Sequence, residues 1–140
     1  MKALIVTFLI IFSGCVFAHA DDVNSSIAPL NLSIINLIAT PEKYDNKIVR
    51  VIGFLNLEPE GNALYLHSED YAKALKQNCI PITIEINSET KKFSGKYVLI
   101  EGLFHSVNDP RYMIASGYIE KIQRLAEWGG DFGVWKPKGK

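Results

Sequence analysis

A long run of residues from Lys47 to Leu57 constrains the fold of this chain more than any other feature. The run is rich in β-branched residues, and apolar residues alternate along it, which is typical of a strand with one buried face. Gly53 interrupts the run near its middle. An isolated glycine within a strand predicts a bulge or a tight bend, and a bend lets one strand serve both halves of a curled sheet. We therefore expect the long first strand of a small barrel.

The residues before this run predict a short helix that ends abruptly. Ser33 can cap the helix. Its apolar residues fall on one stripe, namely Ile34, Leu37 and Ile38. Thr40 ends the helix because a residue before proline avoids the α conformation, and Pro41 can open one further turn. Asp45-Asn46 then supplies a turn that tolerates positive φ.

A second strand is expected from Ala63 to His67, after a turn cluster at residues 58–62. The two strands would form a hairpin, and alternation divides their side chains between two faces. The expected core face carries Val49, Val51, Leu55, Leu57, Leu64 and Leu66. The expected outward face carries Arg50, Phe54, Tyr65 and His67.

A second helix and three further strands are expected downstream. Ser68 can cap the helix, Glu69 and Asp70 complement its dipole, and Asn78 can close it in the left-handed conformation. The strands are expected at residues 80–86, 97–105 and 112–122, with a bend at Gly102. Residues 87–96 are expected to form a polar connection.

These elements predict a mainly β fold, a small five-stranded OB-like barrel with one N-terminal helix and one inter-strand helix. The helix of an OB barrel commonly lies between strands three and four, whereas we expect it here between strands two and three. Dividing the first strand at Gly53 would restore the usual order. The barrel should span residues 33–128, after a flexible leader at 21–32 and before a glycine-rich, aromatic and basic tail at 129–140.

Three stretches resemble a known protein family. They are SIINLIATPEKYDNKIVRVIGFL from Ser33, ALYLHSEDY from Ala63 and SGKYVLIEGLF from Ser94. They are similar to small exported bacterial proteins of uncharacterised function with an OB-like barrel. The resemblance covers residues 33–128 and implies the fold and export, but it brings no catalytic residues. The family pattern has Asp-Gly where this chain has Asp45-Asn46, and asparagine tolerates the same positive φ.

The N-terminus has the features of a secretory signal peptide over residues 1–20. Lys2 precedes a short apolar run, and Ala18-His19-Ala20 forms an A-x-A site directly before Asp21. The apolar run is short for the roughly 20 residues that cross a bilayer. We expect cleavage between Ala20 and Asp21, export to the bacterial periplasm, and no transmembrane span in the mature chain.

A lipid anchor is the alternative to a soluble exported chain. Residues 12–15, Phe-Ser-Gly-Cys, resemble the lipobox of bacterial lipoproteins. In that case Cys15 becomes the lipidated first residue and anchors the protein to the membrane. Phe12 stands where the lipobox usually has leucine, and the apolar run continues beyond Cys15.

Cysteine content and charge exclude several other classes. Without the signal peptide the chain keeps one cysteine, Cys79, so it forms no internal disulfide. The strand-like surroundings of Cys79 indicate a buried apolar residue. The full chain has 15 Lys and Arg and 15 Asp and Glu, and removal of Lys2 leaves a net charge of −1. Nucleic-acid binding usually requires a basic excess, so nucleic acid is not an expected partner.

The outward face of the first two strands is the candidate ligand-binding surface, with Arg50, Phe54, Tyr65 and His67. In OB barrels, extended ligands lie on this side and are held by aromatic stacking and a few charges. The expected ligand is a protein, peptide or glycan of the cell envelope. The alternative is that the neighbouring helix covers Phe54 and Tyr65, which then form a second layer of core.

The C-terminal tail is the candidate partner-binding segment. Trp128, Phe132 and Trp135 lie among glycines. They can pack back onto the barrel, or they can form an exposed aromatic anchor. An exposed anchor would suit an inhibitor or immunity-type partner of a secreted protein, which is the alternative function.

No catalytic motif stands out in the sequence. It contains neither a nucleophile elbow nor a glycine-rich phosphate loop outside the tail. His67, Glu69 and Asp70 form the one local cluster of metal-ligand type, and helix capping explains both acids. An envelope hydrolase acting through His67 or His105 is the remaining enzymatic alternative. We expect a non-enzymatic exported binding or accessory module without metal or cofactor.

Overall fold

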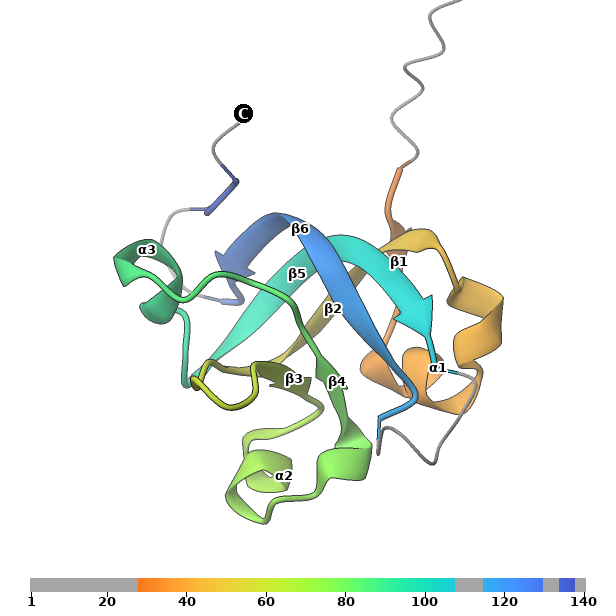
Figure 1. Cartoon of the computed structure of the whole chain (residues 1–140), viewed down its shortest axis with the longest axis horizontal. Helices are drawn as coiled ribbons and strands as arrows, with labels where there is room; N and C mark the ends of the chain where they lie inside the picture. The colour runs from red at the N-terminus through yellow and green to blue at the C-terminus, as the bar shows by residue number, and fades with distance from the viewer. Residues whose placement is uncertain (1–27, 108–114, 130–133, 138–140) are drawn as a thin grey trace, which may run out of the picture.

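The computed structural model describes residues 28–107, 115–129 and 134–137 (Figure 1). The predicted signal peptide at 1–20, the Ala20-Asp21 cleavage site, Cys15 and Phe132 lie outside the described residues. In the part of the chain that is described, no helix has both the length and the apolar character needed to span a membrane.

The described chain is mainly β, with six strands, three short α-helices and two 3-10 helices. In order these are β1 Leu30–Asn31, α1 Ile34–Ala39, η1 Pro41–Tyr44, β2 Lys47–Asn56, β3 Ala63–Tyr65, α2 Ser68–Ala72, η2 Lys76–Asn78, β4 Cys79–Pro81, α3 Ser88–Lys91, β5 Lys96–Ser106 and β6 Gly117–Glu127.

β2 is the central strand of a six-stranded sheet with the order β4-β3-β2-β5-β6. β5 pairs with β2 along one edge, while β1, in parallel, and β3 share its other edge. The remaining pairs are antiparallel. This is an open, strongly twisted sheet, and its ladder does not show the closed five-stranded barrel expected from the sequence (Figure 1). One isolated parallel bridge, between Ile82 and Ile119, joins the two ends, where Thr83 N donates to Ile119 O at 2.8 Å.

The predicted helix and turn before β2 are confirmed. Ser33 caps α1, and its hydroxyl accepts a hydrogen bond from Ile35 N at 3.2 Å. Thr40 follows the helix, and Pro41 opens η1. Asn46 adopts a positive φ of 57° before β2 begins. Each of these signals acts on the backbone beside it, which is why the local sequence specifies them.

Gly53 has a different role from the one predicted. β2 and β5 pair without a shift through Gly53 and Val98, so the expected bulge is absent from this ladder. The irregularity lies instead between β5 and β6, at the predicted Gly102. At Gly53 the requirement is space, because a Cβ there would lie 2.5 Å from Ile34 Cδ1 and 2.7 Å from Tyr65 O. The glycine thus lets α1 and β3 approach β2 closely.

The second helix is shorter than predicted, and its cap lies one residue earlier. His67, not Ser68, is the N-cap of α2, and the Asp70 carboxylate accepts from His67 N at 3.0 Å. Ala74, not Asn78, takes the left-handed conformation, with φ 54°. The Asn78 amide instead donates to Asp70 Oδ1 at 2.7 Å. His67 therefore belongs to a helix start rather than to the expected second strand.

Other strand boundaries also differ from the prediction. The strand expected at 80–86 is reduced to β4, and the polar connection at 87–96 contains α3, which Asn87 caps. Thr90 and Phe93 of that connection are fully buried. β6 continues to Glu127, and β1 pairs two residues of the expected flexible leader with β2.

The core lies on one side of the sheet, where α1 packs against it. Its most buried side chains are Ile34, Leu37, Val49, Val51, Leu55, Leu64, Ile80, Phe93, Val98, Ile100, Phe104, Ile119 and Leu125. The predicted core face of the first hairpin is confirmed, with Leu66 half-buried at its margin. Because alternate residues of a strand point to opposite sides, the remaining side chains of β2 and β5 form a second face.

Candidate functional site

The candidate site is the side of β2 and β5 that faces away from the core, here called the outer face. Cross-strand neighbours in an antiparallel ladder project to the same side. Ile48 and Leu103 lie at one end of this side, and three further pairs carry the candidate site: Arg50 with Glu101, Ile52 with Leu99, and Phe54 with Tyr97. We call them the charged row, the aliphatic row and the aromatic row. They follow one another along β2 at every second residue, so three chemistries succeed one another on one surface.

The aromatic row continues into β3 and α2. The Phe54 ring lies 5.7 Å from the Tyr97 ring and 5.9 Å from the Tyr71 ring. Tyr71 comes from α2, and its ring also packs 5.5 Å from that of Tyr65. Tyr65 is buried and Phe54 is half-buried, whereas Tyr71 and Tyr97 are exposed. The second helix therefore covers Tyr65 and part of Phe54, as the alternative interpretation of these residues expects.

Hydrogen bonds fix two phenols of this cluster, those of Tyr71 and Tyr97. Tyr71 Oη donates to Glu58 Oε1 at 2.7 Å, and Tyr97 Oη accepts from Ser68 N at 3.2 Å. The Tyr71 hydrogen bond lowers the pKa of Glu58, and the same bond raises the pKa of Tyr71. Burial raises the pKa of Tyr65. With raised pKa values, Tyr65 and Tyr71 thus stay protonated at neutral pH and suit packing and hydrogen bonding rather than nucleophilic chemistry.

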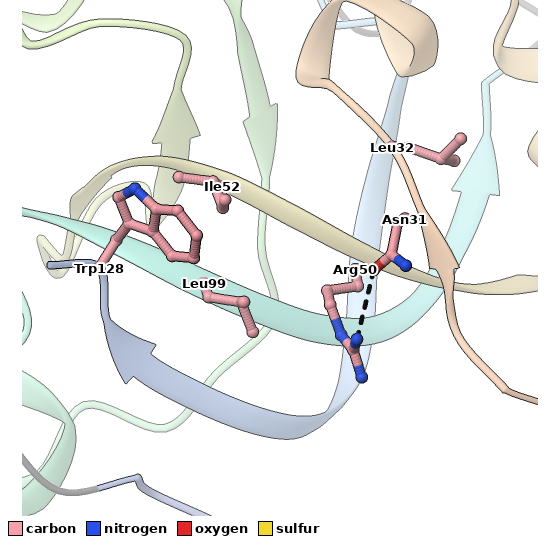
Figure 2. A pocket seen from close by; sticks show the side chains of 6 residues that line it. All are labelled: Asn31, Leu32, Arg50, Ile52, Leu99 and Trp128. Atoms are coloured by element: carbon pink, nitrogen blue, oxygen red, sulfur yellow. Dashed lines mark hydrogen bonds between the residues drawn. The ribbon is translucent and has the colours of Figure 1, made fainter.

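A groove of about 470 Å³ lies over the aliphatic and charged rows (Figure 2). Its lining consists of Asn31, Leu32, Arg50, Ile52, Leu99 and Trp128. Figure 2 shows the indole of Trp128 beside the side chains of Ile52 and Leu99, while Arg50 points toward Asn31. Trp128 N donates to Tyr97 O at 2.8 Å, which holds the turn after β6 against β5. Trp128 and Ile52 are both exposed large apolar side chains.

The charged row forms an ion cluster with two cations around one anion. Arg50 Nε donates to Glu101 Oε1 at 2.8 Å, and Arg124 Nη1 from β6 donates to the same oxygen at 3.2 Å. Arg50 Nη1 also donates to Asn31 Oδ1 at 3.3 Å, so β1 helps to orient this guanidinium. The Glu101 side chain is 12% exposed, and the arginines are 32% and 37% exposed. The cluster therefore presents a net positive charge to solvent.

A second groove borders the same cluster on the side of β6. Its volume is about 530 Å³. It is lined by Glu101, Gln123, Arg124, Val134 and Lys136. The shared carboxylate of Glu101 thus lies between two depressions, and Lys136 adds a further cation to the second one. Together the grooves give the ion cluster an accessible surface on both sides.

The predicted ligand-binding residues have separate positions. Arg50 and Phe54 lie on the outer face, and Tyr65 pairs with Phe54 in the adjoining strand. His67 caps α2 and lines neither groove. Sequence reasoning missed Asn31, Ile52, Leu99, Glu101, Arg124 and the place of Trp128 in the groove. The alternation of β2 already places Ile52 beside Arg50 and Phe54, and this signal could have identified it.

The predicted tail anchor is divided between two positions. Trp135 exchanges backbone hydrogen bonds with Leu125 of β6, at 2.7 and 3.0 Å, and packs half-buried against the core. Trp128 is exposed and contributes to the groove over β2 and β5. Phe132 is outside the described residues. The two tryptophans thus do not form one common surface element.

The remaining candidate groups have local partners. His105 Nε2 lies 3.1 Å from Glu120 Oε1, and its ring stacks on Tyr118 at 5.1 Å. Cys79 is buried, its Sγ donates to Lys76 O at 3.2 Å, and burial raises the pKa of its thiol. Across the described ranges, no three His, Cys, Asp or Glu side chains gather in a way that could hold a metal ion.

Comparison of the chain with protein families, with curated proteins and with solved structures gives no match. The resemblance of residues 33–128 to small exported bacterial proteins therefore stays a prediction. The geometry of the outer face is the observation from which a function can be inferred.

Proposed function

We propose that this protein is an exported, non-enzymatic binding module of the bacterial cell envelope that receives an extended ligand across its outer face. The observation that supports this most directly is the groove formed by Ile52, Leu99 and Trp128 beside the half-buried Arg50. Large apolar side chains that gather next to polar ones at a surface mark interaction sites. Tryptophan and arginine are also the residues that most often dominate binding energy.

We further propose that the sheet is a variant of the OB barrel. Counting from β2, the five longer strands are β2, β3, β4, β5 and β6, and α3 falls between the third and the fourth. This is the usual position of the OB helix, although α2 lies between the second and third of these strands, as expected from the sequence. The isolated bridge between Ile82 and Ile119 supports the approach of the sheet ends. In such barrels the face of the early strands carries extended ligands.

The alternative functions have less support. The hydrogen bonds between Trp135 and Leu125 give Trp135 a packing role, which does not favour an inhibitor anchored through this tryptophan. For a hydrolase, His67 and His105 would have to act on a bound substrate, but neither lines the groove beside Trp128. A ligand in that groove would meet guanidinium, indole and aliphatic groups, which suit binding rather than proton transfer.

A site-specific photo-crosslinking experiment tests the proposed face. A photoreactive amino acid at position 52 should give a cross-linked product in the cell envelope, and the Trp128→Ala variant should reduce its yield. Position 35 on α1 is the matched control, because Ile35 is also an exposed isoleucine but does not line the groove. Equal products from both positions, or a product at position 52 that is insensitive to Trp128→Ala, would contradict the assignment.

The intact mass of the protein purified from the envelope tests export. A chain that begins at Asp21 supports a soluble periplasmic protein. A chain that begins at a lipidated Cys15 would place the same outer face at a membrane surface. A mass that includes residues 1–20 unmodified would contradict export by signal cleavage.

A further inference from the structure

We infer that the ligand of the outer face is an extended acidic peptide segment of a partner protein, and this inference rests on the proposed binding function. A carboxylate of the segment lies against Arg50 and Arg124. A large apolar side chain two residues away enters the groove between Ile52, Leu99 and Trp128.

The net charge of the ion cluster determines the sign of the charge that the ligand carries. Two guanidinium groups share one oxygen of Glu101, at 2.8 and 3.2 Å, and the carboxylate is more buried than either arginine. Lys136 lies in the adjoining groove with Arg124. A ligand that approaches the charged row therefore meets an excess of positive charge, which attracts anions and repels cations.

The hydrogen bonds of the arginines indicate a carboxylate rather than a diffuse negative charge. A guanidinium has five N–H groups. Within the described residues, Arg50 uses Nε for Glu101 and one N–H of Nη1 for Asn31, and Arg124 uses Nη1 for Glu101. No bond to a described residue involves Nη2 of either arginine. Arginine N–H groups bind paired oxygens of a carboxylate or a phosphate bidentately, and the carboxylate is the one of these that an unmodified peptide carries.

The spacing of the rows indicates an extended peptide. Same-side residues of a strand repeat about every 6.5–7 Å, and this is also the repeat of alternate side chains in an extended peptide. A peptide that runs along β2 can thus place an acidic residue at the charged row and an apolar residue at the aliphatic row. The next alternate side chain then meets Tyr97 and the exposed edge of the aromatic row.

A neutral glycan fits these observations less well. Sugars bind mainly by stacking on exposed aromatic faces, and the groove itself offers one such ring, that of Trp128. In the neighbouring aromatic row, Tyr65 is buried and α2 partly covers Phe54. The row between the charged and aromatic rows consists of aliphatic side chains, Ile52 and Leu99, which suit an apolar peptide side chain. The exposed indole of Trp128 can border either ligand, so its substitution tests the site rather than the class.

Selection from a random peptide library identifies the ligand class directly. The protein is expressed from its full sequence, purified from the envelope of an export host and used to select displayed twelve-residue peptides. We expect the enriched peptides to carry Asp or Glu two positions from a large apolar residue. A synthetic copy should bind at least about 10-fold more tightly than its Glu→Gln or Asp→Asn version, because hydrogen bonds to charged groups are the stronger ones.

Protein variants connect this preference to the site. Arg50→Gln should lower the affinity for the acidic peptide by a similar factor and leave the affinity for the amide version nearly unchanged. Trp128→Ala should lower both affinities. Arg124→Gln is the second charge variant, since Arg50 also supports β1 and a loss of folding there would be visible in the melting curve. Ile35→Ala is the matched surface control and should change neither affinity.

The outcomes separate this inference from the function on which it rests. Equal affinity for the acidic and amide peptides, or enriched peptides without Asp or Glu, would overturn the inference of an acidic ligand. The assignment of the outer face as a binding surface would then still hold. Trp128-dependent binding of a neutral oligosaccharide such as maltohexaose, without any Trp128-dependent peptide, overturns the peptide class. Failure of both probes, together with equal cross-linking at positions 52 and 35, overturns the proposed function itself.

Discussion

Replacement of Gly53 by alanine should destabilise the protein far more than the addition of one methyl group suggests. The new Cβ would lie 2.5 Å from Ile34 Cδ1, 2.7 Å from Tyr65 O and 2.8 Å from Leu64 Cγ. Carbon atoms normally approach to about 3.5–4.0 Å, and both aliphatic neighbours are fully buried. Overpacking a core costs about 1–3 kcal/mol. Since one obstructing atom belongs to the backbone of β3, we expect Gly53→Ala to lower the free energy of unfolding by about 3 kcal/mol.

Urea unfolding, followed by tryptophan fluorescence, measures this loss. With a slope of about 1–3 kcal/mol per molar urea, the midpoint should fall by about 1–3 M. Gly61→Ala is the matched control, because a Cβ there meets no atom within 4 Å, and it should change stability by no more than about 1 kcal/mol.

A double variant isolates the steric cause. Ile34→Val removes the Cδ1 atom, so the penalty of Gly53→Ala should be smaller in this background but should persist because Tyr65 O remains in the way. The reasoning would be refuted by a loss for Gly53→Ala no larger than that for Gly61→Ala, or by the same penalty in both backgrounds.

Two further predictions concern titratable groups. Cys79 should resist a thiol reagent at pH 8 while the protein is folded and react once urea unfolds it, because the side chain is buried and burial raises its pKa; rapid reaction of the folded protein would contradict this. The free energy of unfolding should fall between about pH 5 and pH 3, since hydrogen bonds from Ser106 N to Asp45 and from Tyr71 to Glu58 lower the carboxyl pKa values. A carboxylate whose pKa is lowered by folding stabilises the folded protein at pH values above its unfolded pKa. This stabilisation is lost as the pH falls through the folded pKa. Asp45→Asn combined with Glu58→Gln should flatten the pH dependence, and an unchanged slope would count against these bonds.

The parts of the fold that sequence reasoning predicted depend on neighbouring residues. Ser33 caps α1, Pro41 opens η1, and Asn46 provides the positive φ before β2, each by acting on its own stretch of backbone. The alternation of β2 likewise predicted its buried side, because period-two patterning is a property of one strand. These signals need no information about the rest of the chain.

The parts that were missed depend on distant pairing or on a competing local structure. The aliphatic row joins Ile52 to Leu99, and no local pattern indicates that β5 rather than another strand lies beside β2. His67 was placed outward by continuing the alternation past Tyr65, but the strand ends there because Asp70 and the His67 backbone start a helix. Phe93 was hidden because polar residues surround it in the sequence.

The pairing of β2 with a distant strand also affects how fast this chain can fold. Its main partner is β5, and the residues that pair are far apart, Leu55 with Lys96 and Lys47 with Phe104. Such loops must close, at an entropic cost, before any contact across the ladder forms, so sheets of this kind fold on timescales of about milliseconds to seconds. Until then the edge of β2 that pairs with β5 remains open to solvent or to other chains. If the chain is exported as we propose, this delay would favour passage across the membrane before folding and would make the envelope the place where the outer face first assembles.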